Sequence, residues 1–397
     1  PQLGLGWVIS NEKFLSDNNY IDFLKLRATW GQLANGSLSG SSGTNTINTI
    51  VTAIDDTQTG GIIGSSTFQN LKREIMEETN FGISARLFNS RLSLEADYYI
   101  RDIKDLVASR EVPITGNFVF DNIGEMRNKG FEFAANWNQT INDNWKFSIG
   151  GNFATLDNEV TKLDNGREYI DTGSAEFRQR IQVGEPINHF FGLEVAGVYQ
   201  NNTEVANDPI AVDNGLVPGD FKYVDQNNDG IIDDNDRVNI GSYLPTFNYG
   251  ANIKVSYKNF DLSIDMQGQS GNQILNRKRG EVIFTNDTNM DADFAINRWH
   301  GEGTTNSYPS AAGRRKAWNQ KMSSFFIEDG AYFRIQNIQL AYTIKAGTLL
   351  GDNMPETRVY FTADRPFTFF NYNGFNPEVA NGVDRQTYPV PAVYTVG

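Results

Sequence analysis

Cysteine is absent from the 397 residues, and histidine occurs only twice. Without cysteine the chain has no disulfide framework, no thiolate metal site and no cysteine nucleophile. His189 and His300 lie far apart in the sequence, without neighbours spaced for a metal, so packed or surface roles suit both imidazoles. No nucleophile elbow, phosphate-binding loop or dinucleotide-binding motif stands between a strand and a helix pattern. We therefore predict that the protein is not an enzyme.

Long apolar runs and an excess of basic residues are also missing. No segment approaches the roughly 20 apolar residues of a transmembrane helix, and no signal peptide begins at Pro1. Transmembrane strands escape this test, because only alternate residues in them are apolar. The 34 Lys and Arg residues against 48 Asp and Glu residues give a net charge of -14. This charge argues against a nucleic-acid partner, because phosphate binding needs a basic surface.

The sequence does contain strict two-residue alternation, which is clearest in residues 247–268. Its two arms are joined by a tight turn at Lys258-Asn259, where Asn tolerates a left-handed backbone. A sandwich strand would also alternate, but seldom for so many residues with aromatic residues near both ends. The pattern therefore favours a membrane barrel. In the first arm the apolar face holds Phe247, Tyr249, Ala251, Ile253, Val255 and Tyr257.

The same pattern predicts about ten antiparallel strands, joined alternately by short turns and long loops. One phase slip within 332–344 predicts a β-bulge. Short periplasmic turns and long extracellular loops are typical of outer-membrane barrels. We expect the short connections at Asn89, Asn142, Lys258 and Gly351, and extracellular loops at 34–80, 102–128, 157–246, 269–330 and 366–389. The predicted strands are 24–33, 81–87, 92–100, 131–137, 145–153, 247–257, 260–266, 332–344, 359–363 and one starting at 390.

The polar faces of these strands carry charged side chains that need water and space, such as Arg27, Glu95 and Asp265. A narrow barrel fills its lumen with side chains, whereas a barrel of about 22 strands has room for a plug. No linker divides the chain. We therefore predict an all-β, antiparallel transmembrane β-barrel. Residues 1–397 would form its C-terminal portion, with about ten of roughly 22 strands.

An acidic segment at 225–236 matches the spacing of a calcium-binding loop. Oxygen-bearing side chains occupy positions 1, 3, 5, 9 and 12, and Gly230 at position 6 allows the sharp turn. No helical pattern flanks the loop, so we expect a structural Ca²⁺ rather than a sensor. The alternative is a solvated Asn/Asp turn. The predicted ligands are Asp225, Asn227, Asp229, the carbonyl of Ile231, Asp233, and Asp236 in place of the usual Glu.

Four motifs, at 122–133 (NIGEMRNKGFEF), 218–272, 325–344 (FFIEDGAYFRIQNIQLAYTI) and 374–391, resemble a known family. They are similar, in the same order, to the C-terminal barrel region of SusC/RagA-type TonB-dependent outer-membrane transporters. The resemblance implies a large barrel with an N-terminal plug, energised by TonB. It also implies a calcium-binding loop at 225–236. The plug, the TonB box, the earlier strands and an aromatic terminal residue are missing, so we expect this chain to be a fragment.

From the resemblance we expect an active nutrient importer in the outer membrane of a Gram-negative, Bacteroidetes-like bacterium. A SusD-like lipoprotein would be its partner, an oligosaccharide or peptide its substrate, and membrane lipid would surround its wall. The alternative, from a different class, is a secreted calcium-stabilised β-sandwich that binds carbohydrate. Four aromatic residues are candidates for stacking on a sugar or peptide, although packing suits each of them better: Trp299, Trp318, Phe325 and Phe326.

Overall fold

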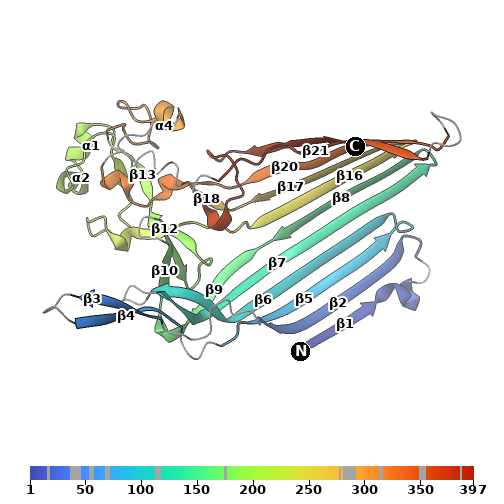
Figure 1. The fold of residues 1–397 in the computed structure, drawn as a ribbon, viewed down its shortest axis with the longest axis horizontal. Helices are drawn as coiled ribbons and strands as arrows, with labels where there is room; N and C mark the ends of the chain where they lie inside the picture. Colours follow the sequence, from blue (N-terminus) through green and yellow to red (C-terminus); the bar gives the residue numbers. More distant parts are fainter. Residues whose placement is uncertain are drawn as a thin grey trace.

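The main element of the computed structural model is a 14-stranded sheet whose strands are inclined in a common direction (Figure 1). Nearly all of its strand pairs are antiparallel, which confirms the predicted all-β class. In the described part of the chain, no helix is long and apolar enough to cross a membrane. The structure describes residues 1–15, 18–35, 46–52, 58–67, 72–111, 118–173, 177–276, 279, 292–312, 316–347, 355–384 and 387–397.

Eleven strands follow one another along this sheet, which we call the wall. Ten of them correspond to the predicted strands, and β1 was not predicted because Gly4 and Gly6 occupy its alternate positions in place of polar residues. The order is β1 (Gln2–Val8), β2 (Ile21–Ala34), β5 (Ile75–Leu87), β6 (Leu92–Glu111), β7 (Phe118–Asn142), β8 (Trp145–Thr155), β16 (Phe247–Tyr257), β17 (Phe260–Ser270), β20 (Tyr332–Ile344), β21 (Thr357–Phe370) and β23 (Val393–Val396). The hairpin β3 (Thr46–Thr52) and β4 (Gln58–Thr67) and the strand β9 (Asp157–Leu163) branch from β7.

The short turns predicted at Asn89, Asn142 and Lys258 gather at one end of the wall, the short-turn end (Figure 1). The turn predicted at Gly351 lies outside the described residues. At the turn between β16 and β17, Tyr257 pairs with Phe260 across two residues. Lys258 takes the left-handed conformation there, with φ of 54°. The predicted turn is confirmed. The prediction that Asn259 adopts the left-handed conformation is wrong, because Lys258 adopts it. The Nζ atom of Lys258 lies 5.3 Å from the centre of the Tyr257 ring, and this contact stabilises the turn.

The expected loop at 102–128 is instead mostly strand. β6 has 20 residues and β7 has 25. At the rise of an extended strand, β7 alone is about 80 Å long. Ion pairs join the strands here on the side that continues the apolar face, with Arg127 Nε of β7 2.7 Å from Asp102 Oδ1 of β6, and Lys104 Nζ of β6 3.2 Å from Glu77 Oε2 of β5. Charged residues interrupt the apolar alternation here, so the sequence pattern stops before the strands end.

The predicted bulge in 332–344 is confirmed. The pairing of β20 with both β17 and β21 shifts in register between Ile335 and Asn337. On β21 the irregularity includes Arg365, with φ of 51°, followed by Pro366. Proline is tolerated in a sheet at such a bulge, because no ladder hydrogen bond is required of it. The bulge explains why the alternation changes phase while the strand continues.

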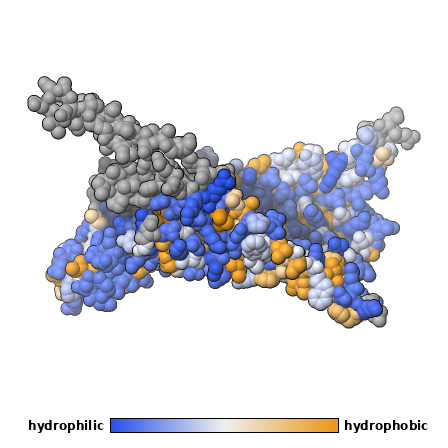
Figure 2. All heavy atoms as spheres, turned by 90° about the horizontal axis from the view of Figure 1, so that it is seen from below, coloured by the Kyte–Doolittle hydropathy of each residue, from blue (hydrophilic) through white to orange (hydrophobic). Residues whose placement is uncertain are grey.

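Alternate residues divide the wall into an apolar face and a polar face. The apolar face exposes large side chains, including Leu5 at 71% and Phe81 at 55%. In Figure 2 hydrophobic residues gather along the lower margin of the wall, and the recessed surface above them is mostly hydrophilic. A β-sandwich would bury this face against a second sheet. Its exposure rules out the sandwich alternative and fits a barrel wall that faces lipid.

Aromatic pairs lie toward both ends of the apolar face. Near the short-turn end, the rings of Trp145 and Tyr257 are 4.3 Å apart. Toward the opposite end, Phe333 stacks between Tyr249 and Phe369, at 6.5 and 6.1 Å. Two aromatic rows flanking an apolar band are typical of the membrane interfaces of a transmembrane barrel.

The long connections fold into a lobe at the end opposite the short turns (Figure 1). One sheet of the lobe contains β10 (Tyr169–Gly173), β11 (Arg178–Gln182), β12 (His189–Leu193) and β15 (Arg237–Gly241). Smaller sheets pair β13 (Val195–Val198) with β14 (Phe221–Tyr223), and β18 (Gln273–Asn276) with β19 (Ile327–Asp329) and β22 (Val383–Asp384). The short helices of the lobe are α1 (Asn202–Ala206), α2 (Pro209–Asp213) and α4 (Ala292–Asn297).

The lobe has its own hydrophobic core, built largely from aromatic residues. Phe221 and Phe326 are fully buried in it, and Trp318 and Phe325 are nearly so. The indole nitrogen of Trp318 donates a hydrogen bond of 2.8 Å to the carbonyl of Phe221. Trp299 packs partly buried against the same core. All four aromatic residues considered for ligand stacking are therefore core residues.

His189 of β12 should make the stability of the lobe depend on pH. Its side chain is fully buried, its Nδ1 lies 3.1 Å from the carbonyl oxygen of Pro186, and its Nε2 has no hydrogen-bond partner. Burial lowers the pKa of His189 below its ordinary value of 6.5. The unfolded chain therefore takes up a proton below pH 6.5 more readily than the folded lobe does. We expect the free energy of unfolding to fall as the pH drops below 6.5.

The measurement is denaturant unfolding of the full-length protein between pH 5 and 8, followed by tryptophan fluorescence. The variant His189→Gln cannot take up the proton, so its stability should vary less with pH over this range. An identical pH dependence in the two proteins would contradict the assignment.

Candidate functional site

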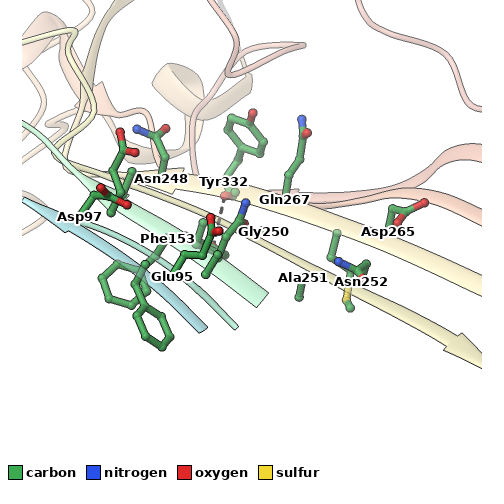
Figure 3. A pocket seen from close by; sticks show the side chains of 18 residues that line it. Glu95, Asp97, Phe153, Asn248, Gly250, Ala251, Asn252, Asp265, Gln267 and Tyr332 are labelled. Atoms are coloured by element: carbon green, nitrogen blue, oxygen red, sulfur yellow. Dashed lines mark hydrogen bonds between the residues drawn. The ribbon is translucent and has the colours of Figure 1, made fainter. Parts of the chain in front are cut away.

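A pocket of about 630 Å³ lies on the polar face of the wall, and we call it the inner pocket. It spans β6, β7, β8, β16, β17 and the start of β20. Asn248, Gln267 and Tyr332 point to one side of the strands, while Phe153 points to the other (Figure 3). The alternation predicted from the sequence thus places the polar side chains on the pocket side. The sequence did not reveal that they surround one cavity.

The inner pocket is lined by carboxylates and amides. None of its described lining side chains is Lys or Arg. One carboxylate is neutralised from outside the pocket, because Arg27 Nε donates to Asp97 Oδ1 at 3.2 Å. The pocket therefore offers hydrogen bonds to hydroxyl and amide groups and repels anions. Its carboxylates are Glu95, Asp97, Glu132 and Asp265, and its amides are Asn152, Asn248, Asn252 and Gln267.

Two glycines make room for the amide side chains of the pocket. In the pairing of β8 with β16, Gly250 lies opposite Asn152, and Gly150 lies opposite Asn252. A Cβ atom at Gly250 would lie 2.6 Å from Asn152 Oδ1, and one at Gly150 would lie 2.6 Å from Asn252 Nδ2. Each asparagine therefore lies over a glycine of the neighbouring strand. A larger residue at either glycine would push an amide out of place.

The acidic loop at 225–236 lies in the lobe and folds around its predicted turn. Gly230 has φ of 81°, and its N–H donates to Asp225 Oδ2 at 2.9 Å. Asp229 accepts from the N–H of Ile231 at 2.8 Å, and its own N–H donates to Asn227 Oδ1 at 3.0 Å. The alternate polar residues therefore turn their oxygens back onto the loop.

Asp236 ties the two ends of this loop together. Its Oδ1 accepts from the N–H of Gln226 at 2.9 Å, and its Oδ2 accepts from the N–H of Asp233 at 2.8 Å. The side chain is fully buried at the end of the short helix η4 (Asp234–Asp236). A buried carboxylate is stabilised by such backbone donors. The shorter Asp at position 12 is thus a structural brace of the loop.

The oxygen-rich donors of the loop fit Ca²⁺ in chemical type. Oδ1 of Asp225 is buried without a hydrogen-bond partner, which suits an atom that coordinates a cation at position 1. Across the described parts of the chain, however, no three His, Cys, Asp or Glu side chains are grouped so that they could hold a metal ion. The calcium ligands therefore remain a prediction.

The beginning of the chain matches a family model described as "TonB dependent receptor-like, beta-barrel", over residues 1–174. Among curated proteins, TonB-dependent receptor P3 of Formosa agariphila is 30% identical over 419 residues, covering 100% of this chain and 41% of its own length. TonB-dependent receptor SusC of Bacteroides thetaiotaomicron is 27% identical over 423 residues, covering 100% of this chain and 39% of its own length. The chain thus spans about two fifths of these relatives.

A solved structure of the RagAB peptide transporter shares the fold. Its TM-score is 0.81 with 22% identity, and the match covers 100% of this chain and 42% of that chain. The RagAB peptide importer in the "open-open" state matches with a TM-score of 0.80 and 23% identity, also over 100% of this chain. The wall and the lobe together therefore follow a known architecture from end to end.

Proposed function

We propose that this chain belongs to the SusC/RagA family of TonB-dependent receptors and forms part of an active nutrient importer in a bacterial outer membrane, because it is similar to TonB-dependent receptor P3 and to SusC over its whole length. Its apolar face would meet lipid, and its polar face would line the solute path. The short-turn end would face the periplasm and the lobe would face the cell exterior. The protein would move solute and catalyse no reaction.

The observation that carries this proposal is the inner pocket on the polar face of a wall whose other face is apolar. A solute path through a membrane needs hydrogen-bonding groups on one side and a lipid-compatible surface on the other. The wall provides both along the same strands, because adjacent residues such as Asn248 and Tyr249 of β16 face opposite sides. The solute would be an oligosaccharide or a peptide.

We propose two partners by analogy with the relatives. A SusD-like lipoprotein would cover the lobe and close the outer mouth of the barrel. TonB would act through a region outside these 397 residues and would drive the transport cycle. Binding of solute would shift the populations of open and closed states.

Loss of import tests the proposal directly. A strain lacking the full-length protein should lose growth on, and uptake of, the solute, and a complementing copy should restore both. A copy that lacks the TonB-interacting region should restore neither. Full uptake without the protein, or without TonB, would contradict the proposal. Migration of the purified protein on a detergent gel should also shift on heating, as a folded barrel requires.

We also propose that the acidic loop binds one structural Ca²⁺ ion. Its ligands would be Asp225, Asn227, Asp229, the Ile231 carbonyl, Asp233 and Asp236. The ion would neutralise the carboxylates and fix the loop within the lobe.

Elemental analysis of the purified full-length protein tests the calcium site. We expect Asp225→Ala and Asp229→Ala each to contain about one calcium fewer per molecule than the wild type. Asp213→Ala, which removes an exposed carboxylate outside the loop, should leave the calcium content unchanged. Equal calcium in all four proteins would remove the site.

A further inference from the structure

A second cavity, which we call the mouth pocket, lies where the wall passes into the lobe. Its volume is about 440 Å³. It is formed by the segment before β16, the end of β17, the start of β18, and the segment that leads through the short helix η8 (Ala380–Gly382) to β22. The lining side chains used below are Tyr243, Pro245, Gln269, Asn272, Pro377 and Glu378.

Asn272 supplies a buried, unpaired acceptor at the wall of this cavity. The residue is 4% exposed, and its Oδ1 atom is buried without a hydrogen-bond partner. Its position is fixed, because its backbone carbonyl accepts from the N–H of Gly330 at 2.9 Å and its Nδ2 packs on the same glycine. A buried acceptor without a donor is unfavourable, and a ligand hydroxyl or N–H would satisfy it.

Glu378 and Tyr332 connect the mouth pocket to the inner pocket. The hydroxyl of Tyr332, a residue that lines the inner pocket, donates to Glu378 Oε1 at 2.8 Å. Arg334 Nη1 donates to Glu378 Oε2 at 2.6 Å, so the charge of this carboxylate is paired. The two cavities therefore share a boundary, and neither is lined by a described Lys or Arg side chain.

We propose that the mouth pocket binds an uncharged sugar unit of the solute before the solute reaches the inner pocket. This inference rests on the proposed import function. A sugar hydroxyl can donate to Asn272 Oδ1 and accept from the amide of Gln269, because it is both donor and acceptor. The ring of Tyr243 and two prolines offer apolar contact to the sugar ring. The carboxylates of the inner pocket disfavour anionic solutes, and the mouth pocket offers an anion no described Lys or Arg side chain in its lining.

Equilibrium binding to the purified full-length protein in detergent tests the proposal. The probes are neutral glucan, mannan, xylan and galactan oligosaccharides, a set of uronic or sulfated oligosaccharides, and a peptide library. We expect a neutral oligosaccharide to bind and Asn272→Ala to weaken that binding about five- to tenfold, as the loss of one hydrogen bond predicts. Gln269→Ala should weaken it in the same direction. Heat-dependent migration on a detergent gel confirms that each variant is folded.

The matched control is Asn144→Ala in a turn at the short-turn end. The backbone of Asn144 makes the turn hydrogen bonds there, so removing its side chain should leave binding unchanged. Unchanged affinity in both pocket variants, or binding of charged oligosaccharides or peptides alone, would overturn the sugar assignment. Full uptake of the solute by a strain without the protein would instead overturn the import function. The two failures are therefore distinguishable.

Discussion

Replacing Ile149 with arginine should destabilise the barrel by about 2–4 kcal/mol. Ile149 lies in the middle of β8 on the apolar face and is 51% exposed. An arginine fits there without steric conflict, so the cost comes from bringing a charge into lipid. The measurement is denaturant-dependent folding of the full-length protein in lipid vesicles, followed by gel migration without heating.

The control for Ile149 is its neighbour, because adjacent strand residues face opposite sides. Ser148 lies on the polar face, where its Oγ is 3.0 Å from Asn136 Oδ1. Ser148→Arg should cost no more than that hydrogen bond, about 1 kcal/mol. Equal destabilisation by the two arginines would contradict the assignment of an outer and an inner face.

Truncation of Phe326 to alanine should destabilise the lobe by about 3–5 kcal/mol. The ring is fully buried, 5.2 Å from that of Phe325, so its removal leaves a cavity that the aromatic core cannot fill. Limited proteolysis should show faster cleavage within the lobe. The described residues of this core all belong to the lobe, so heat-dependent gel migration of the barrel should persist.

Phe375→Ala removes the same atoms from a side chain that is 60% exposed. It should therefore lower the free energy of unfolding of the lobe by at most about 1 kcal/mol. Cleavage within the lobe should be little faster than in the wild type. If Phe326→Ala abolished barrel migration together with lobe protection, the lobe would not be a separately packed unit.

The strands that cross the membrane band could be predicted from sequence, since lipid on one face and water on the other impose a period of two. Strand that extends beyond this band has no such constraint. Residues 102–111 and 118–128 therefore read as loop, although pairs such as Arg127 with Asp102 hold them in the sheet. β1 was not predicted for a related reason. Gly4 and Gly6 stand where polar residues would alternate with Leu3, Leu5 and Trp7.

The pockets could not be predicted, because they depend on pairing between distant segments. Gly150 makes room for Asn252 only because β8 lies beside β16, with the lobe segment 156–246 between them in sequence. Asn272 becomes an unpaired acceptor only when the segment around Gly330 packs over it. By contrast, the acidic loop is a local feature. Its spacing alone predicted the turn at Gly230 that the structure contains.

The most direct test of the barrel wall is a scan of single cysteines along β16. The 397 residues contain no cysteine of their own, so each introduced thiol in this region can carry one spin label. In full-length protein in lipid vesicles, labels at 249, 251, 253 and 255 should collide with oxygen dissolved in the lipid. Labels at 248, 252, 254 and 256 should collide with a water-soluble nickel chelate. Nickel access at every position, without alternation, would contradict the transmembrane wall.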